Sequence, residues 1–283
     1  MKQATESLLA RDEMAGRRFE TMFLADWLDF AFLHFEVDPE ALQQVVPFSL
    51  DLHEGKAFVS LVAFTMKGMR FARGGAFTRW MTAPIATHRF LNLRTYVQCG
   101  EGRGIYFMQE WMNNRFALPL GPRTFGLPYR LGRMEYDNAG PEVKGAMLCG
   151  EGAFQYSGRA DGFAEGAKDP LEAFLLERYV AFASARKVRK FFRVWHEPWR
   201  VRRIGALRIV ENTLFDSLQE DWTETASLVS GHQSAGVNDV WMSRPHTVQE
   251  NFVTGFHPQF SCKGPDIADS CHQWKTTLSE KTT

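Results

Sequence analysis

A tyrosine and an arginine stand side by side just after a predicted turn, and both could contact a ligand. The stretch FGLPYRLGRMEY spans residues 125–136. Gly126 allows a positive φ angle, and Pro128 favours an extended conformation in the residue before it, so the chain turns here and enters a strand. Tyr129, with an ordinary pKa near ~10, is neutral and can donate and accept a hydrogen bond. Arg130 can hold a carboxylate through two parallel hydrogen bonds, or it can lie in solvent at the start of the strand.

A second pair of candidates lies on two predicted strands, THRFLNLRTYVQ at 87–98 and RGIYFMQEWMNN at 103–114. Alternation along a strand places Arg94 on the same face as Asn92. Burial of an arginine without a partner is costly, and Glu110 on the neighbouring strand can serve as that partner. Arg94 and Glu110 therefore either line a polar cavity or form a structural cross-strand pair.

His196 is a further candidate for proton transfer. It lies in WHEPW at the end of a predicted strand and could titrate near neutral pH, although a packed structural histidine is the alternative. The eight histidines show no HxH or HExxH spacing, and the four cysteines form no CxxC pair. The sequence therefore predicts no metal site and no disulfide framework. It contains no GxGxxG or P-loop motif, so we expect no cofactor.

The charge balance argues against polyanionic partners. Thirty-three basic residues balance 33 acidic ones, so no net field attracts nucleic acid or an anionic membrane. The basic stretch at 186–203 interleaves arginine with aromatic residues, as nucleic-acid binders do, but a strand with one solvated face has the same pattern. No apolar run approaches the ~20 residues of a membrane span, and the first thirty residues lack the apolar core of a signal peptide. We predict a cytoplasmic protein with a small-molecule ligand, and homo-oligomerisation is left open.

The remaining pattern predicts the fold. The sequence predicts helices at 38–46 and 169–183, each of which begins at an Asp-Pro pair. The rest is dominated by short aromatic and β-branched segments separated by turn residues. An α+β, predominantly β fold follows, in which an antiparallel β-barrel carries flanking helices and encloses either a ligand or side chains.

One principal domain is the simplest organisation. Residues 1–21 form a polar lead-in, residues 22–248 the barrel domain, and residues 249–283 a polar C-terminal extension outside the core, for which disorder is one interpretation.

Several motifs together resemble a known family. VDPEALQQVVPFSLDL followed by an apolar strand, NLRTYV followed by GIYF, FGLPYRLGRM, LERY and HEPW resemble the uncharacterised YqjF-like family, a domain of unknown function in the acetoacetate-decarboxylase-like superfamily. The resemblance runs from about residue 22 to about residue 248. It implies an antiparallel β-barrel with flanking helices and an internal pocket.

The resemblance also marks a difference. Acetoacetate decarboxylases carry a Pro-Lys-Lys-Leu-Gly run whose first lysine forms an imine with the keto acid, whereas this sequence has Pro128, Tyr129, Arg130, Leu131 and Gly132. Imine formation needs a primary amine with a lowered pKa, which a phenol does not supply. The ten lysines fall mostly at turns or in charged runs, where burial does not lower their pKa. We therefore do not expect a Schiff-base decarboxylase.

Two functions of the pocket remain, beside the alternative of a structural or assembly subunit that uses exposed aromatic surface. The first is binding of a small, partly apolar molecule, anionic if the arginines contact it, with Tyr129, Arg130, Arg94 and Glu110 as contacts. The second is an enzyme of lyase or hydrolase type without an imine, in which Tyr129 or His196 transfers protons and an arginine stabilises developing negative charge.

Overall fold

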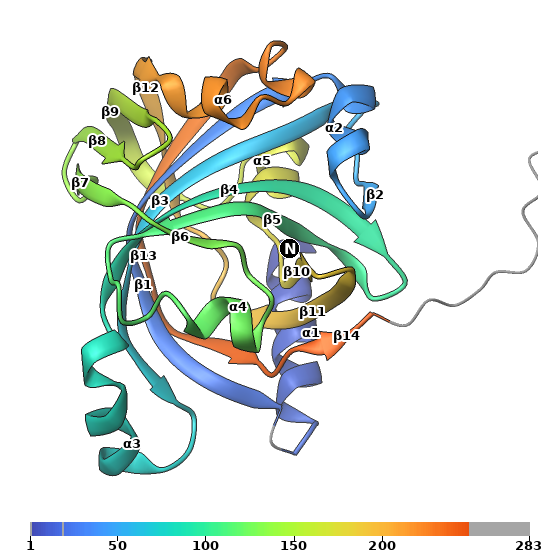
Figure 1. The fold of residues 1–283 in the computed structure, drawn as a ribbon, viewed down its shortest axis with the longest axis vertical. Coiled ribbons are helices and arrows are strands. Elements are labelled where there is room, and N and C mark those ends of the chain that lie inside the picture. Colours follow the sequence, from blue (N-terminus) through green and yellow to red (C-terminus); the bar gives the residue numbers. More distant parts are fainter. Residues whose placement is uncertain (1, 19, 249–283) are drawn as a thin grey trace, which may run out of the picture. The chain divides into compact units, whose positions relative to one another are not determined.

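The strands of the protein form one continuous sheet (Figure 1). The computed structural model describes residues 2–18 and 20–248. The strands are β1 Thr21–Val37, β2 Ser49–Leu50, β3 Ala57–Phe71, β4 His88–Cys99, β5 Gly102–Met112, β6 Tyr129–Leu131, β7 Arg133–Asp137, β8 Glu142–Leu148, β9 Ala153–Glu165, β10 Val180–Ala185, β11 Val188–Trp195, β12 Val201–Asn212, β13 Ser227–Ser243 and β14 His246–Thr247. The helices are α1 Lys2–Ala15, α2 Pro39–Val45, α3 Gly75–Thr82, α4 Leu120–Thr124, α5 Pro170–Leu176 and α6 Thr213–Leu218, with 3-10 turns at Ala83–Ile85 and Asp221–Thr223. The prediction of a predominantly β protein is confirmed.

Part of the sheet closes on itself. Strands β11, β10, β5, β4, β3, β1 and β13 pair in this order, and the end of β13 pairs with β11, so these strands form a closed ring. Strand β5 pairs in parallel with both β10 and β6. The prediction of a purely antiparallel sheet is therefore wrong at these two places. Hairpins force antiparallel pairing, whereas β6 and β10 reach β5 through longer connections that contain helices, and such connections permit parallel pairing.

The ring separates two hydrophobic cores. Strands β12, β9, β8 and β7 extend from β13 and cover the outer face of β3 and β4. Strand β3 is consequently buried on both faces over most of its length. The outer core includes Leu33, Leu61, Leu91, Leu93, Met134, Met147 and Phe154, and the inner core includes Phe30, Phe64, Phe90, Phe107, Phe125 and Phe192.

Helix starts and turns follow local chemistry. The Asp38 carboxylate accepts a hydrogen bond from the Ala41 backbone N–H at 2.8 Å and caps α2, as predicted. Asp169 caps α5 in the same way through the backbone N–H of Glu172, at 2.8 Å. Gly126 has a φ of 78°, which confirms the predicted turn before β6.

The predicted helix at 169–183 is wrong in its second half. Helix α5 ends at Leu176, and Val180–Ala185 forms β10, which pairs with β11 along its length and with β5. The intrinsic helix preference of a short segment amounts to a few tenths of a kcal/mol per residue, so pairing with two strands overrides it. Arg178 therefore lies in the turn between α5 and β10 and not on a helix.

The N-terminal lead-in is docked on the sheet. Met14 of α1 is fully buried, and the Ser7 hydroxyl donates a hydrogen bond to the His196 carbonyl at 2.8 Å. The predicted extension at 249–283 lies outside the described residues. No helix in the described part of the chain has the length and apolar character needed to cross a membrane.

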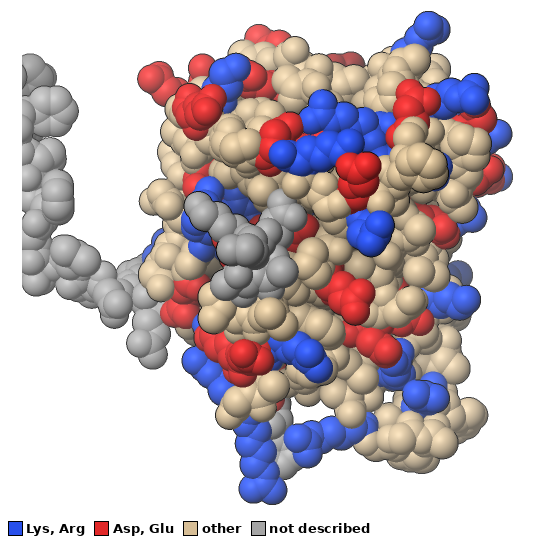
Figure 2. Space-filling view, turned by 180° about the vertical axis from the view of Figure 1, so that it is seen from behind, with Lys and Arg blue, Asp and Glu red and all other residues tan. Residues whose placement is uncertain are grey.

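The basic stretch at 186–203 forms β11 and the start of β12. Its aromatic residues Phe191, Phe192 and Trp199 are buried and therefore not available to stack on bases, and the half-buried Trp195 packs against Trp241 and Arg11. Figure 2 shows basic and acidic side chains intermingled on one face of the molecule. These observations favour an ordinary strand over a nucleic-acid site.

Candidate functional site

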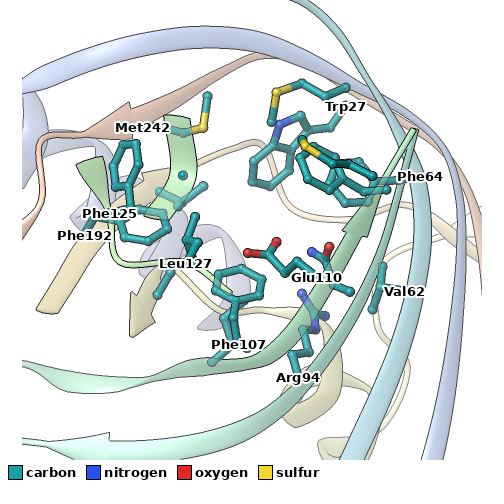
Figure 3. Close-up of a pocket in the computed structure, with 18 of the residues that line it drawn as sticks. Trp27, Val62, Phe64, Arg94, Phe107, Glu110, Phe125, Leu127, Phe192 and Met242 are labelled. Carbon is teal, nitrogen blue, oxygen red and sulfur yellow. The ribbon is translucent and has the colours of Figure 1, made fainter. Parts of the chain in front are cut away.

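A cavity of about 90 Å³ lies inside the ring of strands. Figure 3 shows that aromatic and aliphatic side chains, among them Trp27, Phe64 and Phe125, surround the space into which Arg94 and Glu110 reach. A cavity of ~150 Å³ accommodates benzene, so a guest that fits here without rearrangement is smaller than a benzene ring. Polar groups reach the cavity from His88, Asn92, Arg94, Glu110, Tyr129, Arg178 and His196.

Strand register brings three of these polar side chains into one row. Asn92 on β4 pairs with Glu110 on β5, and Glu110 pairs with Tyr129 on β6. Directly paired residues project to the same face of a sheet, here the inner one. Arg94 lies two residues beyond Asn92 and so shares that face. The structure therefore places Arg94, Glu110 and Tyr129 in one cavity, although they are up to 35 positions apart in the chain.

Glu110 is a buried carboxyl group to which no described residue supplies a counter-ion. Its residue is 3 % exposed, and its Oε2 atom has no hydrogen-bond partner among the described residues. Burial raises the pKa of Glu110 well above its ordinary value of 4.5, which favours the protonated, neutral form. A neutral carboxyl group can donate one hydrogen bond into the cavity.

Arg94 is a buried cation that has no anionic partner among the described residues. Its Nε and Nη2 atoms are buried and have no hydrogen-bond partner in the described part of the chain. Burial lowers the pKa of Arg94, while the neighbouring Tyr96 hydroxyl favours its charged form. The guanidinium lies 5.6 Å from the centre of the Phe32 ring. A guanidinium stays charged in proteins, so a negative group from outside the protein would be strongly attracted here.

The alternative of a structural Arg94–Glu110 ion pair is wrong for this structure. No ion pair within 4.0 Å connects the two side chains, and both keep unpaired polar atoms. In the strand register Arg94 pairs with Phe107, because a bulge after Leu93 shifts β4 against β5. The two side chains therefore share one face of the sheet but are not register partners.

Tyr129 lines the cavity beside Glu110. Burial, and then the charge of Glu110, raise the pKa of the Tyr129 phenol well above its ordinary value. Helix α4 crosses directly over the ring, and a Cβ atom on Gly121 would overlap the ring atoms. Only glycine at position 121 lets the helix approach this closely.

Arg130 lies on the opposite side of β6. Consecutive strand residues project to opposite faces, so Tyr129 points inward and Arg130 outward. The Arg130 side chain is 44 % exposed, pairs with Glu151 and does not line the cavity. Its placement gives no support to the predicted ligand contact.

His196 reaches the cavity as a neutral, packed imidazole. Its Nδ1 lies 2.7 Å from the Glu197 carbonyl oxygen, which can only accept, so this nitrogen carries the proton. Burial lowers the pKa of His196 to about 4. Its ring packs against the rings of Tyr179 and Trp199, at 4.8 and 4.7 Å between centres. The role of His196 in proton transfer stays a prediction.

Two further polar residues line the cavity, and sequence reasoning identified only one of them. The alternation along the strand placed Asn92 on the same face as Arg94, and the Asn92 side-chain oxygen is buried with no partner among the described residues. Arg178 also borders the cavity, which its place within LERY at 176–179 did not indicate. No group of three or more His, Cys, Asp or Glu side chains within residues 2–18 and 20–248 is arranged to hold a metal ion.

The fold defines the class of protein. An acetoacetate decarboxylase-like enzyme from Sphingomonas wittichii RW1 matches with a TM-score of 0.56 and 13 % identity, over 81 % of this chain and 94 % of that one. The acetoacetate decarboxylase of Legionella pneumophila matches with a TM-score of 0.56 and 12 % identity, over 81 % and 88 %. The protein thus has an acetoacetate decarboxylase-like fold.

Sequence comparison gives the family. Residues 24–238 match the family model DUF2071, described as an uncharacterised conserved protein. The uncharacterised protein YqjF of Bacillus subtilis (strain 168) is 32 % identical over 202 residues, which is 68 % of this chain and 79 % of YqjF. The chain belongs to the DUF2071 family, and the resemblance seen in its motifs is confirmed.

Proposed function

We propose that the cavity binds a small carboxylic acid as its carboxylate, with Arg94 as the counter-ion. The observation that carries this proposal is the pair of buried, unpaired nitrogens on Arg94. A buried charge without a partner is costly, and a carboxylate matches the planar fork of a guanidinium. Glu110 favours its neutral form and so leaves the arginine charge free for a ligand.

The other polar groups define how the acid is held. Protonated Glu110 and the Tyr129 phenol can donate hydrogen bonds to ligand oxygens, whereas the Asn92 oxygen can accept one from a hydroxyl group. The apolar wall around them suits a short hydrocarbon part. The volume of about 90 Å³ favours acids of the size of acetate or propionate over benzoate. We also infer that the closed ring of strands serves as a barrel that shields this site from water.

Imine chemistry is not part of the proposal. None of the described residues that line the cavity is a lysine, and Tyr129 and Arg130 stand where acetoacetate decarboxylases keep two lysines. A structural neighbour nevertheless supports a short acid as ligand. The Legionella pneumophila protein is an acetoacetate decarboxylase by name, and acetoacetate is a short acid. Treatment with borohydride and a keto acid is expected to leave the protein unmodified.

Calorimetric titration with propionate at pH 7 tests the binding proposal, with propionamide as the uncharged comparison. The wild type is expected to bind propionate and not propionamide. Arg94→Met is expected to weaken propionate binding at least ~10-fold, because a charge-assisted hydrogen bond contributes about 1.5–3 kcal/mol. Arg130→Ala serves as the matched control and is expected to bind as the wild type does. If the wild type and Arg94→Met bind propionate with equal affinity, and circular dichroism shows that Arg94→Met and Arg130→Ala are folded, the proposal is contradicted.

The Glu110–Tyr129 pair favours a second function, acid–base catalysis of lyase or hydrolase type. The two side chains are register partners, and both have raised pKa values. Strongly perturbed pairs in a cavity are typical of catalytic sites. With a carboxylate held on Arg94, Glu110 is placed to exchange a proton with the ligand.

Deuterium exchange distinguishes the two functions. A purely binding protein leaves the C2 hydrogens of propionate unexchanged in deuterated water, whereas an acid–base catalyst replaces them, as proton NMR can follow. Under the catalytic alternative, Glu110→Gln abolishes the exchange and Tyr129→Phe slows it. If the wild type shows no exchange for propionate or pyruvate, binding alone remains supported.

A further inference from the structure

A second group of buried polar side chains lies in the ring of strands beneath Arg94. His34 on β1 pairs in register with Ser60 on β3 and with Ser230 on β13. These three residues therefore form a row on one face of three adjacent strands. His232 lies two residues beyond Ser230 on the same face, and its ring centre is 5.3 Å from that of His34. His34 and His232 are 0 % and 1 % exposed.

Hydrogen bonding fixes the proton position on His34. The Tyr96 hydroxyl lies 3.0 Å from the Leu175 carbonyl, which can only accept, so Tyr96 donates there. The Ser60 hydroxyl, 2.7 Å from the Tyr96 oxygen, must then donate to Tyr96. The Ser60 oxygen in turn accepts from His34 Nδ1, at 2.7 Å. His34 therefore carries its proton on Nδ1, and Nε2 presents a lone pair.

The state of His232 follows from its carboxylate partner. His232 Nε2 lies 3.3 Å from Glu172 Oε1. Burial disfavours the Glu172 carboxylate, but hydrogen bonds from the Lys168 backbone N–H and from Arg203 outweigh it and lower the pKa of Glu172. An ionised carboxylate only accepts, so Nε2 of His232 donates. Burial lowers the pKa of His232, and the neutral ring leaves a lone pair on Nδ1.

Three buried atoms in this group are left without partners among the described residues. They are His34 Nε2, His232 Nδ1 and the Ser230 hydroxyl oxygen. The first two can only accept in the tautomers derived above, so neither can satisfy the other. Unsatisfied buried polar atoms of this kind are rare in folded proteins and commonly mark an ordered water.

We propose that His34, His232 and Ser230 form a binding site for one buried water molecule. The water donates its two hydrogens to His34 Nε2 and His232 Nδ1 and accepts a hydrogen bond from the Ser230 hydroxyl. A single water satisfies all three atoms, within the two to four contacts usual for a buried water. A cation is disfavoured, because burial opposes positive charge on both rings and Arg94 adds to this at His34.

The water completes a hydrogen-bonded path through the protein. Arg203, whose side chain is 63 % exposed, contacts Glu172 at 2.6 Å. From Glu172 the path runs through His232, the water, His34 and Ser60 to Tyr96, the neighbour of Arg94. The site thereby links the orientation of the Tyr96 hydroxyl, which interacts with the cavity residue Arg94, to the ion pair between Glu172 and the exposed Arg203. This arrangement is independent of what the cavity binds.

Nitrogen-15 NMR on the full-length protein tests the site at pH 7. We expect His34 to show a protonated Nδ1 and an unprotonated Nε2, and His232 the reverse. Cross-relaxation from water to the carbon-bound ring protons of both histidines is also expected. A proton on His232 Nδ1, a charged ring, or no water signal at either ring would overturn the proposal.

Ser230→Ala and Ser227→Ala form a matched pair of variants on β13. Ser227 is exposed and lies outside the group, so its variant should keep the water signal. Ser230→Ala removes one of the three contacts and is expected to lose the signal at both rings while both tautomers persist. A full signal in Ser230→Ala would remove Ser230 from the site and overturn the three-contact arrangement.

Discussion

Two buried arginines, Arg94 and Arg178, border the same cavity but differ in whether a described carboxylate pairs with them. Arg178 has an ion pair with Asp51 at 2.7 Å, donates to the Phe174 carbonyl at 2.8 Å, and lies 4.3 Å from the centre of the Phe174 ring. Arg94 has no ion pair with any described residue and keeps two unpaired nitrogens. A buried cation that the protein neutralises is structural, whereas one that it leaves unneutralised is available to a ligand.

The difference arises from the elements that hold each side chain. Arg178 lies in a turn beside the segment after β2, where Asp51 also accepts from Arg103 at 2.8 Å. Arg94 lies on a central strand whose inner neighbours are aromatic rings and a carboxyl group that favours its neutral form. The turn thus supplies an anion to one arginine and the strand supplies none to the other.

The largest expected effect is on stability, from Arg178→Met. This change leaves Asp51 with only its half-exposed partner Arg103, so the free energy of unfolding is expected to fall by about 3 kcal/mol. Urea denaturation measures it. Arg103→Met is the control and should cost less than ~1 kcal/mol, because the Arg103 side chain is 58 % exposed. Equal losses in both variants would contradict a structural role specific to Arg178.

The next effect is a pH dependence due to Glu110. Its folded pKa lies well above the ordinary 4.5, so the folded state holds a proton that the unfolded state releases. The stabilisation that protonation of Glu110 gives the folded state is therefore fully present below about pH 4.5. It is lost as the pH rises through the pKa of Glu110 in the folded protein. The free energy of unfolding of the wild type should fall relative to Glu110→Gln across that range. Denaturation of both proteins at several pH values checks this, and a constant difference would show that Glu110 is ionised in the fold.

A smaller stability effect is expected for Arg94→Met, in contrast to Arg178→Met. Loss of an unpaired buried charge removes a desolvation cost, so the free energy of unfolding should stay within ~1 kcal/mol of the wild type or increase. Thermal and urea unfolding measure it without ligand. A loss as large as that of Arg178→Met would mean that Arg94 has a structural partner.

The smallest effect is expected for Arg130→Ala. The Arg130–Glu151 pair is exposed on both sides, and such pairs contribute little. The free energy of unfolding should change by less than ~0.5 kcal/mol, and propionate affinity should not change. Weaker propionate binding in this variant would place the ligand outside the cavity.

The errors of sequence interpretation have specific physical causes. Tyr129 and Arg130 were both predicted to contact the ligand, yet neighbours on a strand project to opposite faces, and the structure places only Tyr129 inside. The predicted helix at 169–183 failed after Leu176 because the pairing partners of β10 lie far away in the sequence. Parallel pairing at β5 was missed for the same reason.

The sequence by itself determined the local features: the caps at Asp38 and Asp169, the turn at Gly126, and the alternation that puts Asn92 and Arg94 on one face. These depend on residues a few positions apart, whose side chains and backbone interact directly. Only the tertiary structure decided that, within the described part of the chain, Arg178 has an anionic partner and Arg94 has none, and that Glu110 lies beside Tyr129. Burial and charge neutralisation depend on which distant strands pair and in which register, and no local pattern specifies that.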